Sequence, residues 1–329
     1  MLLTNLTYHP PLFKSRIKTK KYLQSYGFSL RLLFWILGWG IPLFSEPTTL
    51  LEPLVEKKIR TLISSTPKVS KKWEASGIYL KDDFFYIVFD NFHSIAKVGR
   101  DLSNSSENSW MGKEFPTQSG FEGITFQPES KKFLITKESD SFQNQFKPVV
   151  HEYSPDFETL EVYPIDFPLK KANKGAEGIA YFKTKSDTFI LLLLEKPSTL
   201  NLGSKERGNI LVLRKTNNKY QQVSFLSIPQ KVGFLDYSDI AWNGSKIAIL
   251  SQESSALWIG ELDTAWNWKN SGKIYNFPLE EGLPKYCNLE GITWVNENTV
   301  ALVSDSAKKK QPPKCKEKSE MIHIWELRE

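Results

Sequence analysis

A carboxylate or hydroxyl residue recurs five times along the chain, each time directly before a glycine or an aspartate and then an isoleucine. Carboxylates held close together repel one another unless protons or a cation offset their charge. Calcium accepts several oxygen ligands in irregular geometry, so we predict that these residues surround one Ca2+ ion. The alternative is a strand-start signature, in which each acid binds only neighbouring backbone amides. The predicted ligands are Ser76, Glu122, Glu177, Ser238 and Glu290.

A second set of acids follows the first by 14 to 18 residues, each at the end of a β-rich run such as FFYIVFD or TVALVSD. A carboxylate near a metal ion can act as a general base, so these acids are catalytic candidates. Two lysines beside them, Lys137 and Lys196, are candidates for binding substrate. Ordinary charges at loop ends are the alternative. The candidate acids are Asp90, Glu138, Glu195, Glu253 and Asp305.

Several other chemistries have no motif in this chain. The sequence contains no G-x-S-x-G, no H-E-x-x-H and no P-loop, and its four histidines argue against a histidine-rich metal site. The net charge of +6 arises in residues 1–45, where six Lys or Arg residues occur without any acid. The remainder is close to neutral and lacks a basic stripe interleaved with aromatics, so we predict no nucleic-acid partner.

The five repeated positions are 46, 55, 61 and 52 residues apart, the length of a four-stranded propeller blade. A polar turn and a β-rich run follow each one, and no helical pattern of 10–15 residues intervenes. We therefore predict an all-β fold, a five-bladed β-propeller, with a degenerate sixth blade left open. The last repeat has only three strands. An N-terminal segment, roughly residues 60–74, is predicted to complete it and close the ring.

This architecture predicts where the two acidic sets lie. The first strand of each blade lines the central channel, and the second strand returns to the face where the first began. The predicted calcium ligands are then expected in the channel, and the second acids around its mouth, on one face that we call the top. The glycine after each repeated acid is expected to let the innermost strands approach one another closely.

Residues 1–45 are predicted to be a targeting segment outside the fold. The apolar run at 32–44 follows a basic region, is shorter than the ~20 residues of a membrane span, and fits a signal-peptide core. We predict export to the periplasm or the medium. An uncleaved membrane anchor at 32–44 and a buried or organelle-targeting segment are the alternatives. Residues 46–65 are then a linker, and residues 66–329 the propeller domain.

The chain has two cysteines, Cys287 and Cys315, which flank the last repeat. In the predicted propeller both lie on the top face, so they are a candidate disulfide, with two free thiols as the alternative. The run Lys308–Lys310 in the same loop is more typical of a solvated charge run than of a phosphate site.

The order Ser, Glu, Glu, Ser, Glu at the repeated positions resembles the axial ligand pattern of the calcium-activated nucleotidases, the apyrase family of five-bladed propellers. The blade openings are also similar to those of the SdiA-regulated and phytase-like propeller groups. The resemblance covers roughly residues 66–329 and implies a central calcium ion. It also matches Lys137-Glu138 to the Lys-Glu pair that nucleotidases have at the corresponding strand end.

Two features of the nucleotidases have no counterpart here. Asn91 follows Asp90 where that family has an arginine, and Glu195-Lys196-Pro197 stands where its paired arginines occur. The resemblance therefore implies the calcium site more strongly than it implies nucleotide hydrolysis.

Two functions follow from these predictions. In the first, the protein is an exported, metal-dependent hydrolase of a phosphorylated or ester-bearing small molecule. Calcium polarises an oxygen or orients a water, and a rim acid such as Glu138 or Asp90 acts as base. In the second, calcium only stabilises the ring, and the top face binds a ligand or a partner protein. Propellers host many functions, so the fold alone does not choose between them. We expect a monomer that contacts a membrane only through its N-terminal segment.

Overall fold

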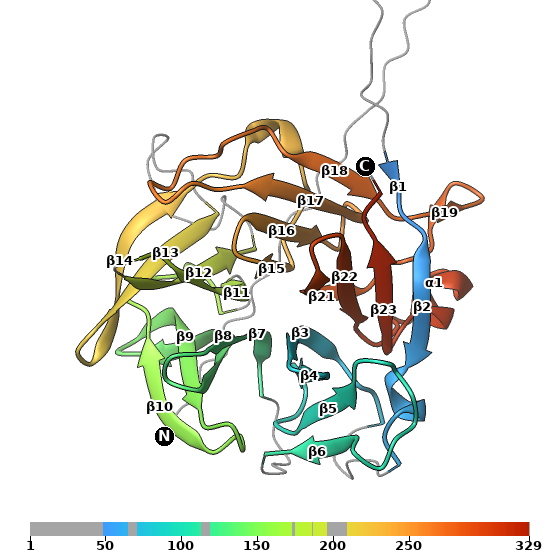
Figure 1. The fold of residues 1–329 in the computed structure, drawn as a ribbon, viewed down its shortest axis with the longest axis horizontal. Helices are drawn as coiled ribbons and strands as arrows, with labels where there is room; N and C mark the ends of the chain where they lie inside the picture. Colours follow the sequence, from blue (N-terminus) through green and yellow to red (C-terminus); the bar gives the residue numbers. More distant parts are fainter. Residues whose placement is uncertain are drawn as a thin grey trace, which may run out of the picture. The chain divides into compact units, whose positions relative to one another are not determined.

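The computed structural model describes residues 49–64, 71–112, 119–172, 175–185, 187–195 and 209–328. Five antiparallel sheets surround a central channel, with strands β3, β7, β11, β15 and β21 innermost (Figure 1). This confirms the predicted five-bladed β-propeller. The predicted targeting segment, residues 1–45, lies outside the described residues. In the described part of the chain, no helix is long and apolar enough to cross a membrane.

The first three blades each use four consecutive strands. Blade one comprises β3 (Ala75–Lys81), β4 (Phe84–Phe89), β5 (Ile95–Gly99) and β6 (Ser109–Met111). Blade two comprises β7 (Phe121–Gln127), β8 (Lys132–Phe142), β9 (Gln145–Tyr153) and β10 (Thr159–Pro164). Blade three comprises β11 (Ala176–Lys183), β12 (Thr188–Leu194), β13 (Ile210–Thr216) and β14 (Lys219–Leu226).

The last two blades take strands from the start of the described chain. Blade four comprises β15 (Asp239–Trp242), β16 (Lys246–Ser251), β17 (Ala256–Glu261) and β18 (Lys273–Asn276), with β1 (Thr49–Leu50) added parallel to β18. Blade five comprises β21 (Leu289–Asn296), β22 (Thr299–Ser304), β23 (Met321–Glu326) and β2 (Pro53–Lys58). A hairpin, β19 (Leu279–Glu280) with β20 (Leu283–Pro284), and the short helix α1 (Pro313–Glu317) complete the elements discussed here.

The ring closes through an N-terminal strand, as predicted, but the strand is not the expected one. β2 pairs antiparallel with β23 at residues 53–58, inside the range assigned to a linker and ahead of residues 60–74. Three of its six residues are exposed and the other three are half-buried, because β2 forms the outer edge of the blade. A weak hydrophobic alternation of this kind is typical of an edge strand that carries Pro, Lys and Glu.

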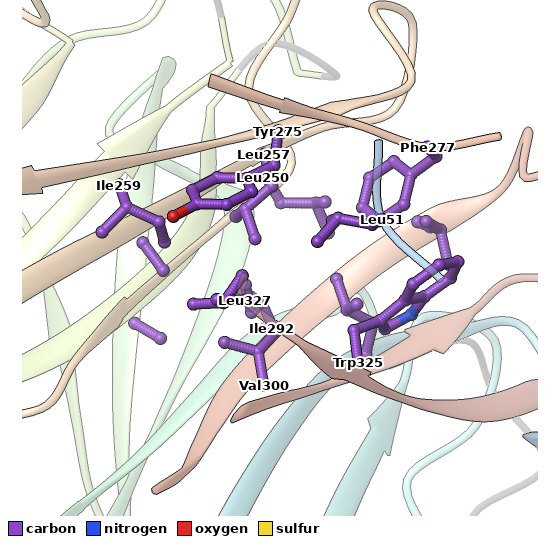
Figure 2. Packing of buried hydrophobic residues seen from close by; sticks show 14 of the residues in the cluster. Leu51, Leu250, Leu257, Ile259, Tyr275, Phe277, Ile292, Val300, Trp325 and Leu327 are labelled. Carbon is purple, nitrogen blue, oxygen red and sulfur yellow. The ribbon is translucent and has the colours of Figure 1, made fainter. Parts of the chain in front are cut away.

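Each pair of neighbouring blades shares one apolar cluster, so the core consists of five inter-blade layers. Figure 2 shows the layer between blades four and five, where Trp325, Phe277 and Leu51 pack together. The side chains of Trp325 and Phe277 meet edge to face, with ring centroids 5.1 Å apart. Leu51 belongs to the segment between β1 and β2, so the N-terminal strands contribute to the core as well as to the sheets.

The innermost strands come closest at the residue after each repeated acid. A Cβ atom on Gly123 would lie 2.9 Å from the Gly178 Cα, and one on Gly291 would lie 2.8 Å from the Gly77 Cα. Four blades therefore need glycine at this level. We call the five residues Gly77, Gly123, Gly178, Asp239 and Gly291 the constriction ring.

Asp239 is the one member of the constriction ring with a side chain. Its carboxylate accepts hydrogen bonds from the backbone N–H of Ile240 and from that of Ile292 in the next blade, both at 2.8 Å. Burial raises its pKa, and those two hydrogen bonds oppose the shift. The carboxylate thus links blades four and five at the narrowest part of the channel.

Cys287 and Cys315 form a disulfide, which confirms the candidate pair; their Cα atoms are 5.4 Å apart. The bond joins the segment before β21 to α1. We expect the free energy of unfolding of the double variant Cys287→Ser/Cys315→Ser to be about 2 kcal/mol lower than that of the native protein, because the variant lacks the cross-link that restricts the unfolded chain. Denaturant titration with and without reductant measures this. Reductant should destabilise the native protein and leave the stability of the variant unchanged. Identical unfolding curves for native protein and variant, with and without reductant, would contradict the prediction.

Candidate functional site

A cavity of about 390 Å³ lies in the channel on the side where the innermost strands begin. Nine carboxylate residues and one lysine line it among the described residues, together with Tyr237, Ser238 and Gln252. The charged residues are Glu74, Asp90, Glu122, Glu138, Glu177, Glu195, Asp236, Glu290, Asp305 and Lys308. We call this space the acidic cavity. Its strong excess of negative charge favours cations over anions.

The structure brings four of the five predicted calcium ligands to the acidic cavity: Glu122, Glu177, Ser238 and Glu290. Ser76 is not among its lining residues. The Ser76 hydroxyl is buried and donates a hydrogen bond to the backbone oxygen of Phe121, 2.5 Å away in the next blade. The Ser238 hydroxyl donates to the Leu289 backbone oxygen at 3.4 Å. The two serines therefore join blades, because a hydroxyl at this position reaches the neighbouring strand.

Four of the five predicted rim acids also reach the acidic cavity: Asp90, Glu138, Glu195 and Asp305. Glu253 is not among the lining residues; its backbone N–H donates to the carboxylate of Asp236.

The lysines differ from the prediction. The Lys137 ammonium pairs with Asp140 at 2.8 Å and does not line the acidic cavity, and Lys196 lies outside the described residues. Lys308, which the sequence left as a solvated charge, is the cation that lines it. A substrate-binding role for Lys137 is therefore not supported by its position, since its charge is already paired.

Five lining residues were not among the predicted site residues: Glu74, Asp236, Tyr237, Gln252 and Lys308. Glu74 and Asp236 each precede a repeated position by two residues, so extending the repeat alignment backwards could have found them. Asp236 accepts a hydrogen bond from the Ser251 hydroxyl at 2.5 Å. Gln252 donates from Nε2 to the Glu290 carboxylate at 2.8 Å. That donation holds one carboxylate of the cavity in place.

Three carboxylates of the acidic cavity converge. Single oxygens of Glu138, Glu177 and Glu195 all lie within 4.8 Å of one another, and all three side chains are half-buried. This cluster, the carboxylate triad, combines one predicted calcium ligand with two predicted rim acids. An all-oxygen donor set of this kind suits a hard cation such as Ca2+ or Mg2+. The donors present thus fit calcium, with ligands partly different from those predicted.

Local backbone features build the carboxylate triad. Glu138 lies where β8 shifts register against β9, between Lys137 and Asp140, so the strand turns a carboxylate toward the channel. Gly175 permits this, because a Cβ atom there would lie 2.0 Å from the Glu138 backbone oxygen. Glu195 follows β12 directly, and its N–H donates to the Gly175 backbone oxygen at 3.2 Å.

Burial and mutual repulsion raise the pKa values of several carboxyls in the acidic cavity. Burial, and then the charge of Glu177, raise the pKa of Glu122. Burial and the charge of Asp305 likewise raise the pKa of Glu290. Burial raises the pKa of Asp305 to about 7, against the hydrogen bond from the Ser306 N–H. Without a compensating cation, these carboxyls therefore hold protons at pH values where isolated carboxyls have lost them.

Comparisons with known proteins find solved structures that resemble this chain, but they do not assign it to a family. No family model and no curated protein matches this chain. Similar solved structures include the PQQ-bound aldose sugar dehydrogenase of Streptomyces coelicolor, with 12% identity and a TM-score of 0.46 over 84% of this chain and 99% of that one. A GH43_1 enzyme from Xanthomonas citri has 8% identity and a TM-score of 0.47 over 81% and 91%. At TM-scores below 0.5, these likenesses say nothing about activity, ligand or metal.

Proposed function

We propose that the protein is a calcium-binding β-propeller and that the acidic cavity holds the ion. The carboxylate triad of Glu138, Glu177 and Glu195 supports this most directly, because its oxygens converge in a cavity with seven further charged groups, only one of them positive. Burial and mutual repulsion raise the pKa of Glu122 and of Glu290, and a bound cation would offset both effects. In this proposal the triad ligates the ion, and Glu122 lies next to Glu177 as an auxiliary charge.

Calcium should stabilise the native protein, and Glu177→Gln should remove most of that effect. A ligand that binds only the folded state adds about 2.7 kcal/mol at a hundredfold excess over its Kd. Melting temperatures with calcium and with chelator measure it. Glu297→Gln, an exposed acid in the turn between β21 and β22, is the matched control and should keep the full calcium response. A wild-type melting temperature that calcium does not change would refute the proposal.

A second candidate is a metal-dependent hydrolase of a phosphorylated or ester-bearing small molecule. The observation that favours it is Asp305, a lining residue whose pKa of about 7 suits general acid-base work. Lys308, in the same cavity, can orient an anionic group of the substrate. A bound calcium ion supplies polarisation of an ester or phosphoryl oxygen. Asp305 would take a proton from an attacking water, and its position in the cavity limits access of bulk solvent.

The hydrolase candidate predicts a pH profile. As a general base Asp305 acts only when ionised, so turnover should rise as the pH passes through its pKa, which is about 7 in the cation-free cavity and lower once calcium is bound. Asp305→Asn should lower kcat about 100-fold or more and abolish that rise. Generic phosphoesters and carboxylic esters, assayed with calcium and with chelator, provide the test. If calcium binds and no ester is turned over at any pH, the protein is a non-catalytic calcium-binding propeller, and the top face binds a ligand or partner.

Export is part of the proposal. The disulfide between Cys287 and Cys315 supports it, because such bonds persist in oxidising compartments. Cell fractionation followed by N-terminal sequencing tests this. A mature protein beginning near residue 45 outside the cytoplasm supports a cleaved signal, whereas full-length protein in the membrane fraction supports an anchor at residues 32–44.

A further inference from the structure

A second cavity, of about 330 Å³, lies on the other side of the constriction ring. It has no lining residue in common with the acidic cavity. Among the described residues that line it there is one acid, Glu129. Its carboxylate accepts a hydrogen bond from the Tyr181 hydroxyl at 2.6 Å and pairs with Lys183 at 2.5 Å. The charges of this lower cavity therefore cancel, and it favours an uncharged occupant.

Aromatic rings from four different blades line the lower cavity. They belong to Tyr79, Phe126, Tyr181 and Trp242. Between them the channel wall carries small residues, such as Ala180 and Ala241, which leave room for a ligand. A volume of about 330 Å³ is at the lower end of the range for small-molecule sites, which are commonly apolar and aromatic with a few placed polar groups. A flat molecule of one or two rings matches this shape.

Two buried hydroxyls supply the placed polar groups. Thr125 and Thr293 are only 3% and 4% exposed, and both line the lower cavity. The Thr125 oxygen accepts a hydrogen bond from the Tyr181 N–H at 3.2 Å, and the Thr293 oxygen accepts one from the Leu80 N–H at 3.3 Å. Each hydroxyl retains its own hydrogen, for which the described part of the chain shows no protein acceptor. Buried donors of this kind require an acceptor, which a ligand or a water supplies.

We propose that the lower cavity is a ligand site for a small, uncharged aromatic molecule with a carbonyl oxygen. The rings of Tyr79, Phe126, Tyr181 and Trp242 contact its flat body, and the hydroxyls of Thr125 and Thr293 donate to its carbonyl oxygen. The site is chemically opposite to the acidic cavity, which attracts cations, and it does not depend on calcium.

Benzamide is a suitable probe, and toluene is the matched probe without the acceptor. Saturation-transfer NMR on the whole protein should show saturable binding of benzamide, with Overhauser contacts to the Trp242 indole. The double variant Thr125→Val/Thr293→Val should weaken benzamide binding about tenfold, since each hydrogen bond contributes modestly, and should leave toluene unaffected. The variant Thr125→Ser/Thr293→Ser keeps both hydroxyls and should bind benzamide normally.

Calcium and chelator should give the same benzamide affinity, which separates this site from the proposed calcium site. The wild-type Overhauser contacts to Trp242 test the location even if a valine variant unfolds. Absence of saturable benzamide binding to the native protein would mean that the two hydroxyls hold only water and would overturn the proposal. Equal affinity of folded valine and serine variants would also overturn it.

Discussion

Gly123→Ala should destabilise the propeller by roughly 3–5 kcal/mol, a large effect for one added methyl group. The added Cβ would meet three backbone atoms of the next blade: the Ile179 nitrogen at 2.8 Å, and the Cα and carbonyl carbon of Gly178 at 2.9 and 3.1 Å. No side chain can move aside there. The five blades form a closed ring, so a shift of one innermost strand disturbs the others. Chemical denaturation measures the loss.

Gly282→Ala is the matched control for this prediction. Gly282 has a φ of 79°, and no atom lies within 4 Å of its added Cβ. It therefore reports only the strain of a left-handed backbone, about 1–2 kcal/mol. A Gly123→Ala protein as stable as the Gly282→Ala control would show that the constriction ring is looser than described.

Glu56→Ala should cost up to about 3 kcal/mol at neutral pH. It removes the contacts of Glu56 in β2 with His323 in β23 and with Lys318, which we call the clasp, and these contacts hold the closing strand in place. Burial alone would raise the pKa of Glu56, but hydrogen bonds with His323 and Lys318 outweigh it and lower the pKa from 4.5 to about 2. The Nδ1 atom of His323 lies 2.8 Å from Glu56 Oε1. The gap between the two pKa values corresponds to about 3 kcal/mol of stability, with partial exposure making this an upper figure.

The sign of the pH dependence follows from the lowered pKa. The contribution of Glu56 is complete above pH 4.5 and is lost as the pH falls toward 2. The difference in unfolding free energy between native protein and Glu56→Ala should thus shrink steadily between pH 5 and pH 3. Glu52→Ala, in the same segment and paired with Arg328 only at 3.9 Å on the surface, should change stability by less than about 1 kcal/mol. A pH-independent difference for Glu56→Ala would assign its effect to packing alone.

The five-bladed fold could be predicted from the sequence because the innermost strand of each blade begins with a similar three-residue motif. Glu122-Gly123 and Glu177-Gly178 mark innermost strands, and both functions of the motif, a carboxylate in the channel and a close backbone approach, are found in the structure. The disulfide was also predictable, since both cysteines flank one repeat. Periodic features of this kind survive in a single sequence.

The positions of the side chains in the acidic cavity could not be predicted from the repeat. The convergence of Glu138 with Glu177 and Glu195 depends on a register shift within β8 and on the absence of a side chain at Gly175. Among the described residues, no other blade has a register shift between its second and third strands. The contacts of the serine hydroxyls could not be predicted either, because whether a short side chain donates to the next strand depends on the distance between the two strands.

The pairing of β2 with β23 has a consequence for how the chain is made. Glu56 and His323 are 267 residues apart, so the clasp cannot form until nearly the whole polypeptide has left the ribosome. Until then β2 has no partner strand and blade five is incomplete, and an unpaired strand can pair with other chains. A chain truncated before β23 would lack the strand that joins β22 to β2, so blade five would stay incomplete and the ring would stay open. We expect such a chain to be degraded as unfolded protein.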